Sequence, residues 1–146
     1  MTVIVYRDGV MAADTGGDVA GAVHRWARKL AKAADGTLYG VGGAASEAHE
    51  LLAWVDAGCE GDMPKPRDTG DGSNSFIIMR AAPSAAVEII DAHGTERFMP
   101  SAAYVVMGAA REVALGALWA GASAEQAVRA CLEHSACVHG DVVTIR

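Results

Sequence analysis

The sequence is poor in cysteine and has neither a long apolar run nor an apparent leader. Cys59, Cys131 and Cys137 are its three cysteines in 146 residues, and so sparse and odd a set does not form a disulfide framework. We therefore expect reduced thiols, which suit the cytosol. No apolar run reaches the roughly 18 residues that a membrane-spanning helix needs. The first residues lack the basic and apolar regions of a signal peptide, so the sequence predicts a cytoplasmic protein with no membrane partner.

Basic residues are also too few for a nucleic-acid-binding protein. The formal net charge is −6, whereas a nucleic-acid surface needs a basic stripe. The chain has 51% hydrophobic residues and 17 glycines, and only 5% of its residues are aromatic. This composition is typical of a folded globular protein with close packing. Its length fits one domain over residues 1–146.

The first 14 residues predict a β-hairpin. Residues 3–6 are β-branched and aromatic, Asp8-Gly9 is typical of a two-residue turn, and residues 10–13 form the return strand. Such a hairpin would bring Thr2, at its open end, close to Asp14.

Strands and helices are predicted over the rest of the chain. Helical spacing of apolar residues predicts a helix over residues 20–34, and the Pro- and Gly-rich residues 59–73 predict a surface loop. Ser46 is the expected N-cap of a helix over residues 47–56, and Ser123 with Gln126 forms a capping box before another helix. We expect helices also over 109–120 and 123–134, and strands over 37–43, 75–80, 86–91, 96–99, 103–107 and 142–145. Helix pairs with antiparallel strands favour layered α+β packing.

Thr2 directly follows Met1, which leaves two interpretations. Thr2 is either a solvent-facing strand residue or, after removal of Met1, the first residue with a free α-amine. A hydroxyl is a weak nucleophile without an adjacent base. A free α-amine, whose pKa is about 7.7–8.0, would be partly neutral at physiological pH and would lie on the same residue.

Three further residues are candidates to support such a nucleophile. Asp14 and Lys29 could supply charges that orient the amine and lower the pKa of the hydroxyl. Gly42 could supply a backbone N–H that stabilises an oxyanion, because glycine lets the main chain approach a substrate closely. The alternative interpretations are plainer: Asp14 as a strand-end turn residue, Lys29 as a solvated charge, and Gly42 as part of a turn.

Several motifs, taken in order, resemble those of one enzyme family. TVIVYRDGVMAADT resembles the opening of proteasome β-subunits and of the HslV-type peptidase, which begin with Thr and return on a strand ending in Ala-Ala-Asp-Ser/Thr. Arg28-Lys29-Leu30 resembles the family's Lys-Val or Lys-Ile step, and GVGGAASEAHELLAW resembles its glycine turn and following helix. VVMGAAREVALGALWAGASAEQAV resembles the later helix pair, especially in short, prophage-type members.

The resemblance implies the α+β fold of the N-terminal nucleophile (Ntn) hydrolases, a four-layer αββα sandwich. It implies that Thr2 is the nucleophile, with its amine as general base, Asp14 and Lys29 as supporting charges and Gly42 as oxyanion donor. It also places residues 26–32 on a strand, and we prefer this to the local helical pattern because tertiary context overrides a weak propensity.

The same resemblance implies a threonine peptidase that cuts polypeptides without a metal or organic cofactor. Members assemble into homo-oligomeric rings, and an ATP-dependent unfoldase is the partner that the family implies, in a bacterial or phage-infected host. The family's S1-pocket positions correspond to four small, uncharged residues, which predict a roomy pocket for large apolar side chains: Gly17, Ala27, Gly40 and Ala44.

Two segments depart from the family pattern. The family's Gly-Ser-Gly turn reads Gly108-Ala109-Ala110, and both polar positions of its Asp-x-x-Ser/Thr-Gly segment are changed, to Ser135 and Val138. These changes motivate an alternative, a catalytically silent structural or ring-assembly protein that keeps the fold.

A zinc site is a separate alternative. Cys131, His134, Cys137 and His139 have a C-x2-H-x2-C-x-H spacing, and thiolates and imidazoles at such intervals can bind zinc. The first pair lies at the end of a predicted helix, so all four side chains would have to converge across a helix-to-strand junction. Buried structural cysteines are the plainer interpretation.

Overall fold

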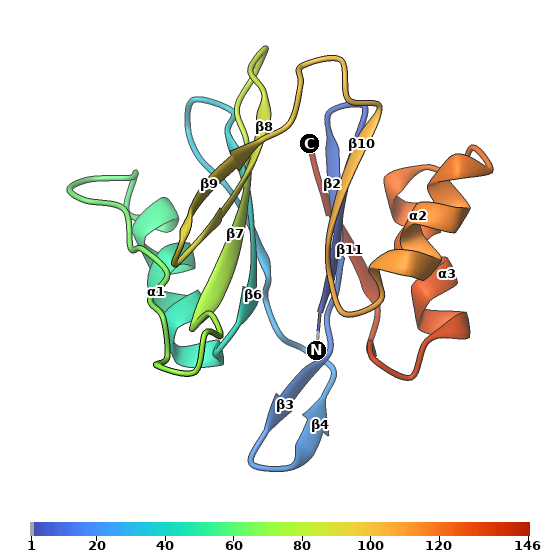
Figure 1. Cartoon of the computed structure of the whole chain (residues 1–146), viewed down its shortest axis with the longest axis horizontal. Helices are drawn as coiled ribbons and strands as arrows, with labels where there is room; N and C mark the ends of the chain where they lie inside the picture. Colours follow the sequence, from blue (N-terminus) through green and yellow to red (C-terminus); the bar gives the residue numbers. More distant parts are fainter. Residues whose placement is uncertain (1) are drawn as a thin grey trace.

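The computed structural model describes residues 2–146, and these residues form four layers. Figure 1 shows two β-sheets face to face, with helices on both outer sides. Helix α1 (Ala45–Asp56) covers one sheet, and helices α2 (Arg111–Trp119) and α3 (Ala124–His134) cover the other. Met1 lies outside the described residues. The α+β fold, a four-layer αββα sandwich, is confirmed.

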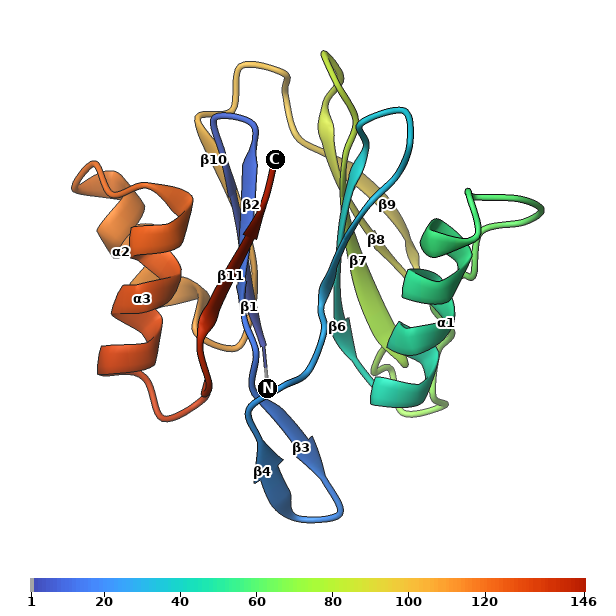
Figure 2. The same cartoon turned by 180° about the vertical axis from the view of Figure 1, so that it is seen from behind.

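Both large sheets are antiparallel throughout (Figure 2). One has the strand order β10-β1-β2-β11, built from Val3–Arg7 (β1), Val10–Asp14 (β2), Tyr104–Gly108 (β10) and Val142–Ile145 (β11). The other has the order β5-β6-β7-β8-β9, built from Leu30–Lys32, Leu38–Gly43, Phe76–Ala81, Val87–Asp91 and Gly94–Arg97. A short hairpin of β3 (Gly17–Val19) and β4 (Ala22–His24) extends beyond them at the end where the chain begins.

Three apolar clusters hold the four layers together. Strand β1 shows why: Val3 and Val5 face α2 and α3, whereas Ile4 faces the opposite sheet, because side chains alternate along a strand. Both faces of β1 are therefore buried, which explains its unbroken apolar run. The third cluster lies between α1 and the five-stranded sheet and contains Leu51, Leu52 and Phe76.

The first hairpin forms as its sequence predicts. Asp8 and Gly9 have φ values of +53° and +76°, as the favoured two-residue hairpin turn requires. The register pairs Ile4 with Ala13 and Arg7 with Val10. Asp14, the last residue of β2, therefore lies beside the start of β1.

The helix predicted over residues 20–34 is wrong. The segment contains β4 and β5, and Ala20 and Gly21 form a turn with φ values of +54° and +77°. The helical spacing rested mainly on alanines, which fit either structure, and the pairing of β5 with β6 decided the outcome. The strand implied over 26–32 is present only from Leu30 onward.

The predicted helix ends were partly right. Ser123 caps α3 in a full capping box with Gln126. Ser46 does not cap α1, because that helix already begins at Ala45 and its N-cap is Ala44. Strand β9 begins at Gly94, two residues earlier than predicted, since Gly94 pairs with Asp91 across the turn. Among residues 2–146, no helix combines the length and the apolar character needed to cross a membrane.

Candidate active site

Thr2 directly precedes β1, at the end of the sandwich from which the β3–β4 hairpin extends. Its carbonyl oxygen accepts a hydrogen bond of 2.8 Å from the backbone N–H of Ala109. A side chain at Gly108 would collide with the same carbonyl. Across the sandwich, a Cβ atom at Gly42 would lie only 3.1 Å from Thr2 Cγ2, so the bare main chain of Gly42 faces the threonine side chain.

Asp14 and Lys29 form a buried ion pair next to this position. Lys29 Nζ lies 2.9 Å and 2.8 Å from the two carboxylate oxygens of Asp14. The exposed fractions of the two side chains are 7% for Lys29 and 0% for Asp14. Asp14 also accepts hydrogen bonds from the backbone N–H groups of Val3 (2.9 Å) and Gly16 (3.1 Å). Four hydrogen bonds from three donor groups therefore satisfy this carboxylate.

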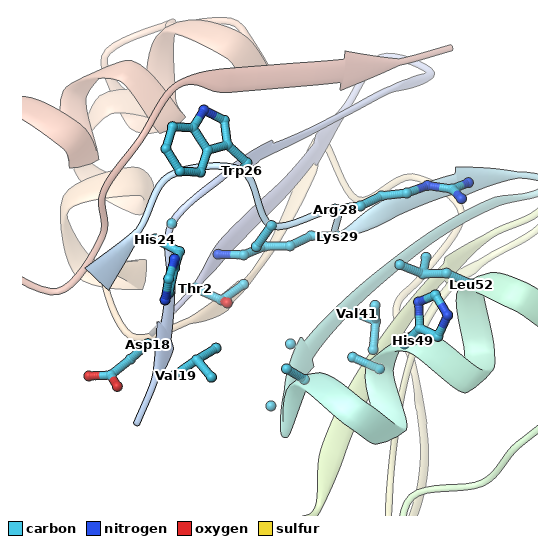
Figure 3. Close-up of a pocket in the computed structure, with 17 residues that line it drawn as sticks. Thr2, Asp18, Val19, His24, Trp26, Arg28, Lys29, Val41, His49 and Leu52 are labelled. Atoms are coloured by element: carbon cyan, nitrogen blue, oxygen red, sulfur yellow. The ribbon is translucent and has the colours of Figure 1, made fainter. Parts of the chain in front are cut away.

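Burial governs the electrostatics of the pair. Loss of hydration lowers the pKa of Lys29, and the charge of Asp14 and its hydrogen bonds act in the opposite direction. A lysine held in this way supplies a positive potential, and the lowered pKa eases its deprotonation. Both effects can increase the nucleophilicity of a nearby hydroxyl. In Figure 3 the Lys29 side chain extends toward Thr2.

A cavity of about 450 Å³ opens in front of Thr2. Figure 3 shows two walls. The β3–β4 hairpin carries Asp18, Val19 and His24 on one side, and β6 with α1 carries Val41, His49 and Leu52 on the other. Thr2, Lys29 and Gly42 line the same cavity, so three of the four predicted catalytic residues meet there. Asp14 lies behind Lys29.

The predicted S1 residues divide into two groups. Gly17 and Ala27 line the cavity and face each other, since a Cβ at Gly17 would lie 3.2 Å from that of Ala27. Gly40 and Ala44 are not among the residues that line it. A Cβ at Gly40 would point at Ile4 and Met11 in the core between the sheets. The small size of Gly40 thus serves the contact between the sheets.

Sequence reasoning missed most of the apolar wall. Val41, Ala48 and Leu52 line the cavity from β6 and α1, and the spacing of Ala48 and Leu52 on a predicted helix was the available signal. The wall formed by the β3–β4 hairpin was missed as well, because the sequence pattern predicted a helix over part of that hairpin.

The segment before β5 is fixed to α1 by a surface ion pair. Arg28 donates two hydrogen bonds, of 2.5 and 2.8 Å, to the carboxylate of Asp56. This pairing lowers the pKa of Asp56. Arg28 and Lys29 point in opposite directions (Figure 3). Arg28 therefore links this segment to α1, and Lys29 links it to Asp14 at the candidate site.

The positions that depart from the family pattern have other partners here. Ala109 contributes its backbone to Thr2, as described above. The hydroxyl of Ser135, at the end of α3, accepts a hydrogen bond from the backbone N–H of Cys137 at 3.1 Å. Val138 is 2% exposed and belongs to the core under α2 and α3.

The structure does not support the zinc alternative. Cys131 is fully buried, and its thiol donates a hydrogen bond to the carbonyl oxygen of Ala110 at 3.5 Å. Burial raises the pKa of this thiol to about 11, which disfavours a thiolate ligand. Between residues 2 and 146, no three His, Cys, Asp or Glu side chains are grouped where they could hold a metal ion.

Comparisons with known proteins find likeness in structure but not in sequence. No family model matches the chain, and no curated protein matches it significantly. Eukaryotic HslV from Trypanosoma brucei superimposes with a TM-score of 0.68 at 15% identity, covering 99% of this chain and 98% of that one. Anbu from Hyphomicrobium sp. strain MC1 gives 0.66 at 10% identity, covering 99% and 80%. Its Gly-1 mutant gives 0.64 at 11%, with the same coverage. At these identities the likeness shows the fold alone: the chain has the proteasome-like αββα fold shared with HslV and Anbu.

Proposed function

We propose that this protein is a threonine peptidase of the N-terminal nucleophile type. The observation that carries the proposal is the buried Asp14–Lys29 pair, held beside Thr2 in the wall of a cavity. Burying two charges costs more than an apolar pair of similar size. The Asp14–Lys29 pair lies next to a hydroxyl and an open cavity, and a catalytic role would explain why the protein keeps it despite this cost.

The proposed reaction starts with removal of Met1, which gives Thr2 a free amine. The Thr2 hydroxyl oxygen attacks the carbonyl carbon of a peptide bond, and the α-amine takes the hydroxyl proton. The N–H of Gly42 stabilises the oxyanion. The leaving amine receives the proton, an ester to Thr2 remains, and water hydrolyses it to release the second product. Lys29, held by Asp14, favours the ionised oxygen electrostatically.

Substrates in this proposal are polypeptides with a large apolar side chain at the cleavage site. The wall formed by Val41, Ala48 and Leu52 is apolar, and Gly17 and Ala27 leave room opposite. We assign the S1 pocket to this cavity. Its proposed lining therefore excludes Gly40 and Ala44 and includes residues of α1. His49 and Asp18 lie at its two sides.

We further propose a homo-oligomeric ring that encloses these sites and receives substrate from an ATP-dependent unfoldase. The β3–β4 hairpin supports self-association. Its strands have three residues each, and Val19 and Val23 are 53% and 50% exposed. A two-stranded hairpin of this kind is marginally stable in water by itself.

The test is turnover of fluorogenic peptides by the purified chain and two variants. Thr2→Ala should reduce kcat by roughly a thousandfold or more, because the nucleophile is lost. Thr144→Ala, at an exposed position of β11, is the matched control and should keep full activity. Peptides with a large apolar residue before the cut should be cleaved faster than acidic ones. Unchanged turnover by Thr2→Ala would refute the proposal.

A silent structural protein is the second candidate. The observation in its favour is that Val138 is buried in the core and the Ser135 hydroxyl is bound to Cys137, so neither reproduces the polar group that the family resemblance implies. In that case the wild-type chain and Thr2→Ala would have the same background rate, and both would still form the same oligomer in sedimentation.

A further inference from the structure

Thr15, which directly follows Asp14, joins three segments around the candidate site. Its hydroxyl donates to the carbonyl oxygen of Arg25 at 2.7 Å and accepts from the backbone N–H of Asp141 at 2.8 Å. Its own backbone N–H donates to Asp141 O at 3.0 Å, and its carbonyl accepts from Ala27 N at 2.8 Å. The residue is 9% exposed. Thr15 therefore ties the end of β2 both to the segment before β5 and to the loop before β11.

The packing around Thr15 leaves little freedom. A side chain at Gly140 would collide with the Thr15 hydroxyl oxygen, and a Cβ at Gly16 would lie 2.6 Å from His139 O. The loop before β11 thus rests with its main chain directly on residues 15 and 16. A shift of Thr15 would have to move this loop as well.

The segment that carries Lys29 depends on few backbone contacts. Residues 25–29 lie between β4 and β5 and form no regular strand. Thr15 holds the early part through Arg25 and Ala27, and Val41 N donates to the carbonyl of Lys29 at 2.9 Å. The path of the main chain between these points determines where the Lys29 ammonium meets Asp14.

From these contacts we infer that Thr15 is a positioning residue, whose hydroxyl fixes the Lys29 segment and the loop before β11 around Asp14. The inference rests on the proposed function, because the geometry it maintains is that of the Thr2 site. Thr15 is not among the residues lining the cavity in front of Thr2; it lines a second cavity of about 350 Å³, which Lys29 and Asp14 also line. Its loss should therefore reduce kcat and leave KM nearly unchanged.

The activity test compares three variants. Thr15→Val keeps the shape and removes the hydroxyl, and Thr15→Ser keeps the hydroxyl. Thr37→Val makes the same change at another buried threonine, 3% exposed and in the turn before β6. Thr15→Val should lower kcat about tenfold, the effect of one or two lost hydrogen bonds on the geometry. Thr15→Ser and Thr37→Val should stay within about threefold of wild type.

Acylation of lysines gives a second measurement that does not need activity. The chain contains three lysines, of which Lys32 and Lys65 are exposed and Lys29 is buried. Mass spectrometry after brief treatment with an amine-reactive ester gives the rate at Lys29 relative to the other two. That ratio should rise about tenfold in Thr15→Val, as the segment opens locally more often. It should stay at the wild-type value in Thr15→Ser and Thr37→Val.

The two measurements separate the two proposals. If wild type shows no Thr2-dependent turnover, the proposed function fails and the acylation ratio alone decides whether Thr15 holds Lys29. If wild type is active and Thr15→Val keeps both kcat and Lys29 protection, the positioning role is overturned and the function stands. Should Thr15→Val not fold, Thr15→Ala replaces it, with the same expected changes and the same contradicting result.

Discussion

Two charged clusters in this protein look alike in geometry and differ in surroundings. Asp14 is paired with Lys29, and Glu88 is paired with Arg80 and, at 2.7 Å, with Arg97. Burial would raise the pKa of Glu88, but the hydrogen bonds from both arginines outweigh it and lower that pKa. The arginine side chains are 35% and 69% exposed, so the cations of this cluster remain hydrated.

The difference indicates which cluster belongs to a site. Arg80, Glu88 and Arg97 are direct cross-strand neighbours on β7, β8 and β9, and such pairs are an ordinary means of stabilising a sheet. In the Asp14–Lys29 pair both charges are buried, and Lys29 lines the cavity of Thr2. An ion pair alone is therefore weak evidence for a functional site, whereas a fully buried pair beside a hydroxyl and a cavity favours a catalytic role.

Removing one member of the buried pair should have the largest effect. Lys29→Met leaves the Asp14 carboxylate buried without its cation, which costs about 3–5 kcal/mol of unfolding free energy. Peptide turnover should be lost as well. Urea unfolding and a peptide assay measure both, and Lys32→Met on the exposed side of β5 is the control. Retained turnover by a folded Lys29→Met protein would remove Lys29 from the proposed mechanism.

Removing the charge of the other cluster should affect stability alone. Glu88→Gln weakens the charged hydrogen bonds to two arginines, and we expect a loss of about 1.5–3 kcal/mol. Turnover per folded molecule should not change, because Glu88 lies on β8, away from the Thr2 cavity. A drop in kcat comparable to that of Lys29→Met would contradict the comparison between the clusters.

The Arg28–Asp56 pair should give a smaller, pH-dependent effect. Because Arg28 lowers the pKa of Asp56 below its ordinary 3.8, the contribution of the pair to stability is fully present above that value. It is lost as the pH falls through the lowered pKa. Thermal unfolding of wild type and Asp56→Asn should therefore differ at neutral pH and converge in acid, with less difference at high salt. A difference that persisted unchanged in acid would argue against this pairing.

The smallest effect concerns thiol reactivity. Burial raises the pKa of Cys131 to about 11, so little thiolate exists at pH 8 and the folded chain shields it. Iodoacetamide should modify Cys137, which is partly exposed, and spare Cys131 until the protein is unfolded in urea. Rapid alkylation of Cys131 in the folded state would show that the core under α3 opens readily.

Much of the fold could be predicted because its local signals agreed with its tertiary contacts. The Asp8-Gly9 turn, the capping box at Ser123 and the apolar run of β1 each form as expected. Local spacing did not predict β4 and β5, because alanine spacing imitates a helix and the strands form only against β3 and β6. Only the family resemblance indicated a strand at β5.

The candidate site divides in the same way. Asp14, Lys29 and Gly42 could be selected from motifs and their order in the chain. The walls of the cavity could not, since Val41, His49 and Leu52 meet the hairpin only after the sheets have packed. The role of Thr15 was also hidden, because its hydrogen-bond partners lie 10 and 126 residues away in the sequence.

Whether Thr2 acts as an N-terminal nucleophile can be decided by a covalent probe. The native chain is treated with a peptide epoxyketone, which reacts with a hydroxyl and an amine of the same residue, and its intact mass is recorded. The native chain should lack Met1 and carry one probe on Thr2, and the Thr2→Ala chain should carry none. A chain from its own host that retains Met1 and stays unmodified would show that Thr2 is not an N-terminal nucleophile.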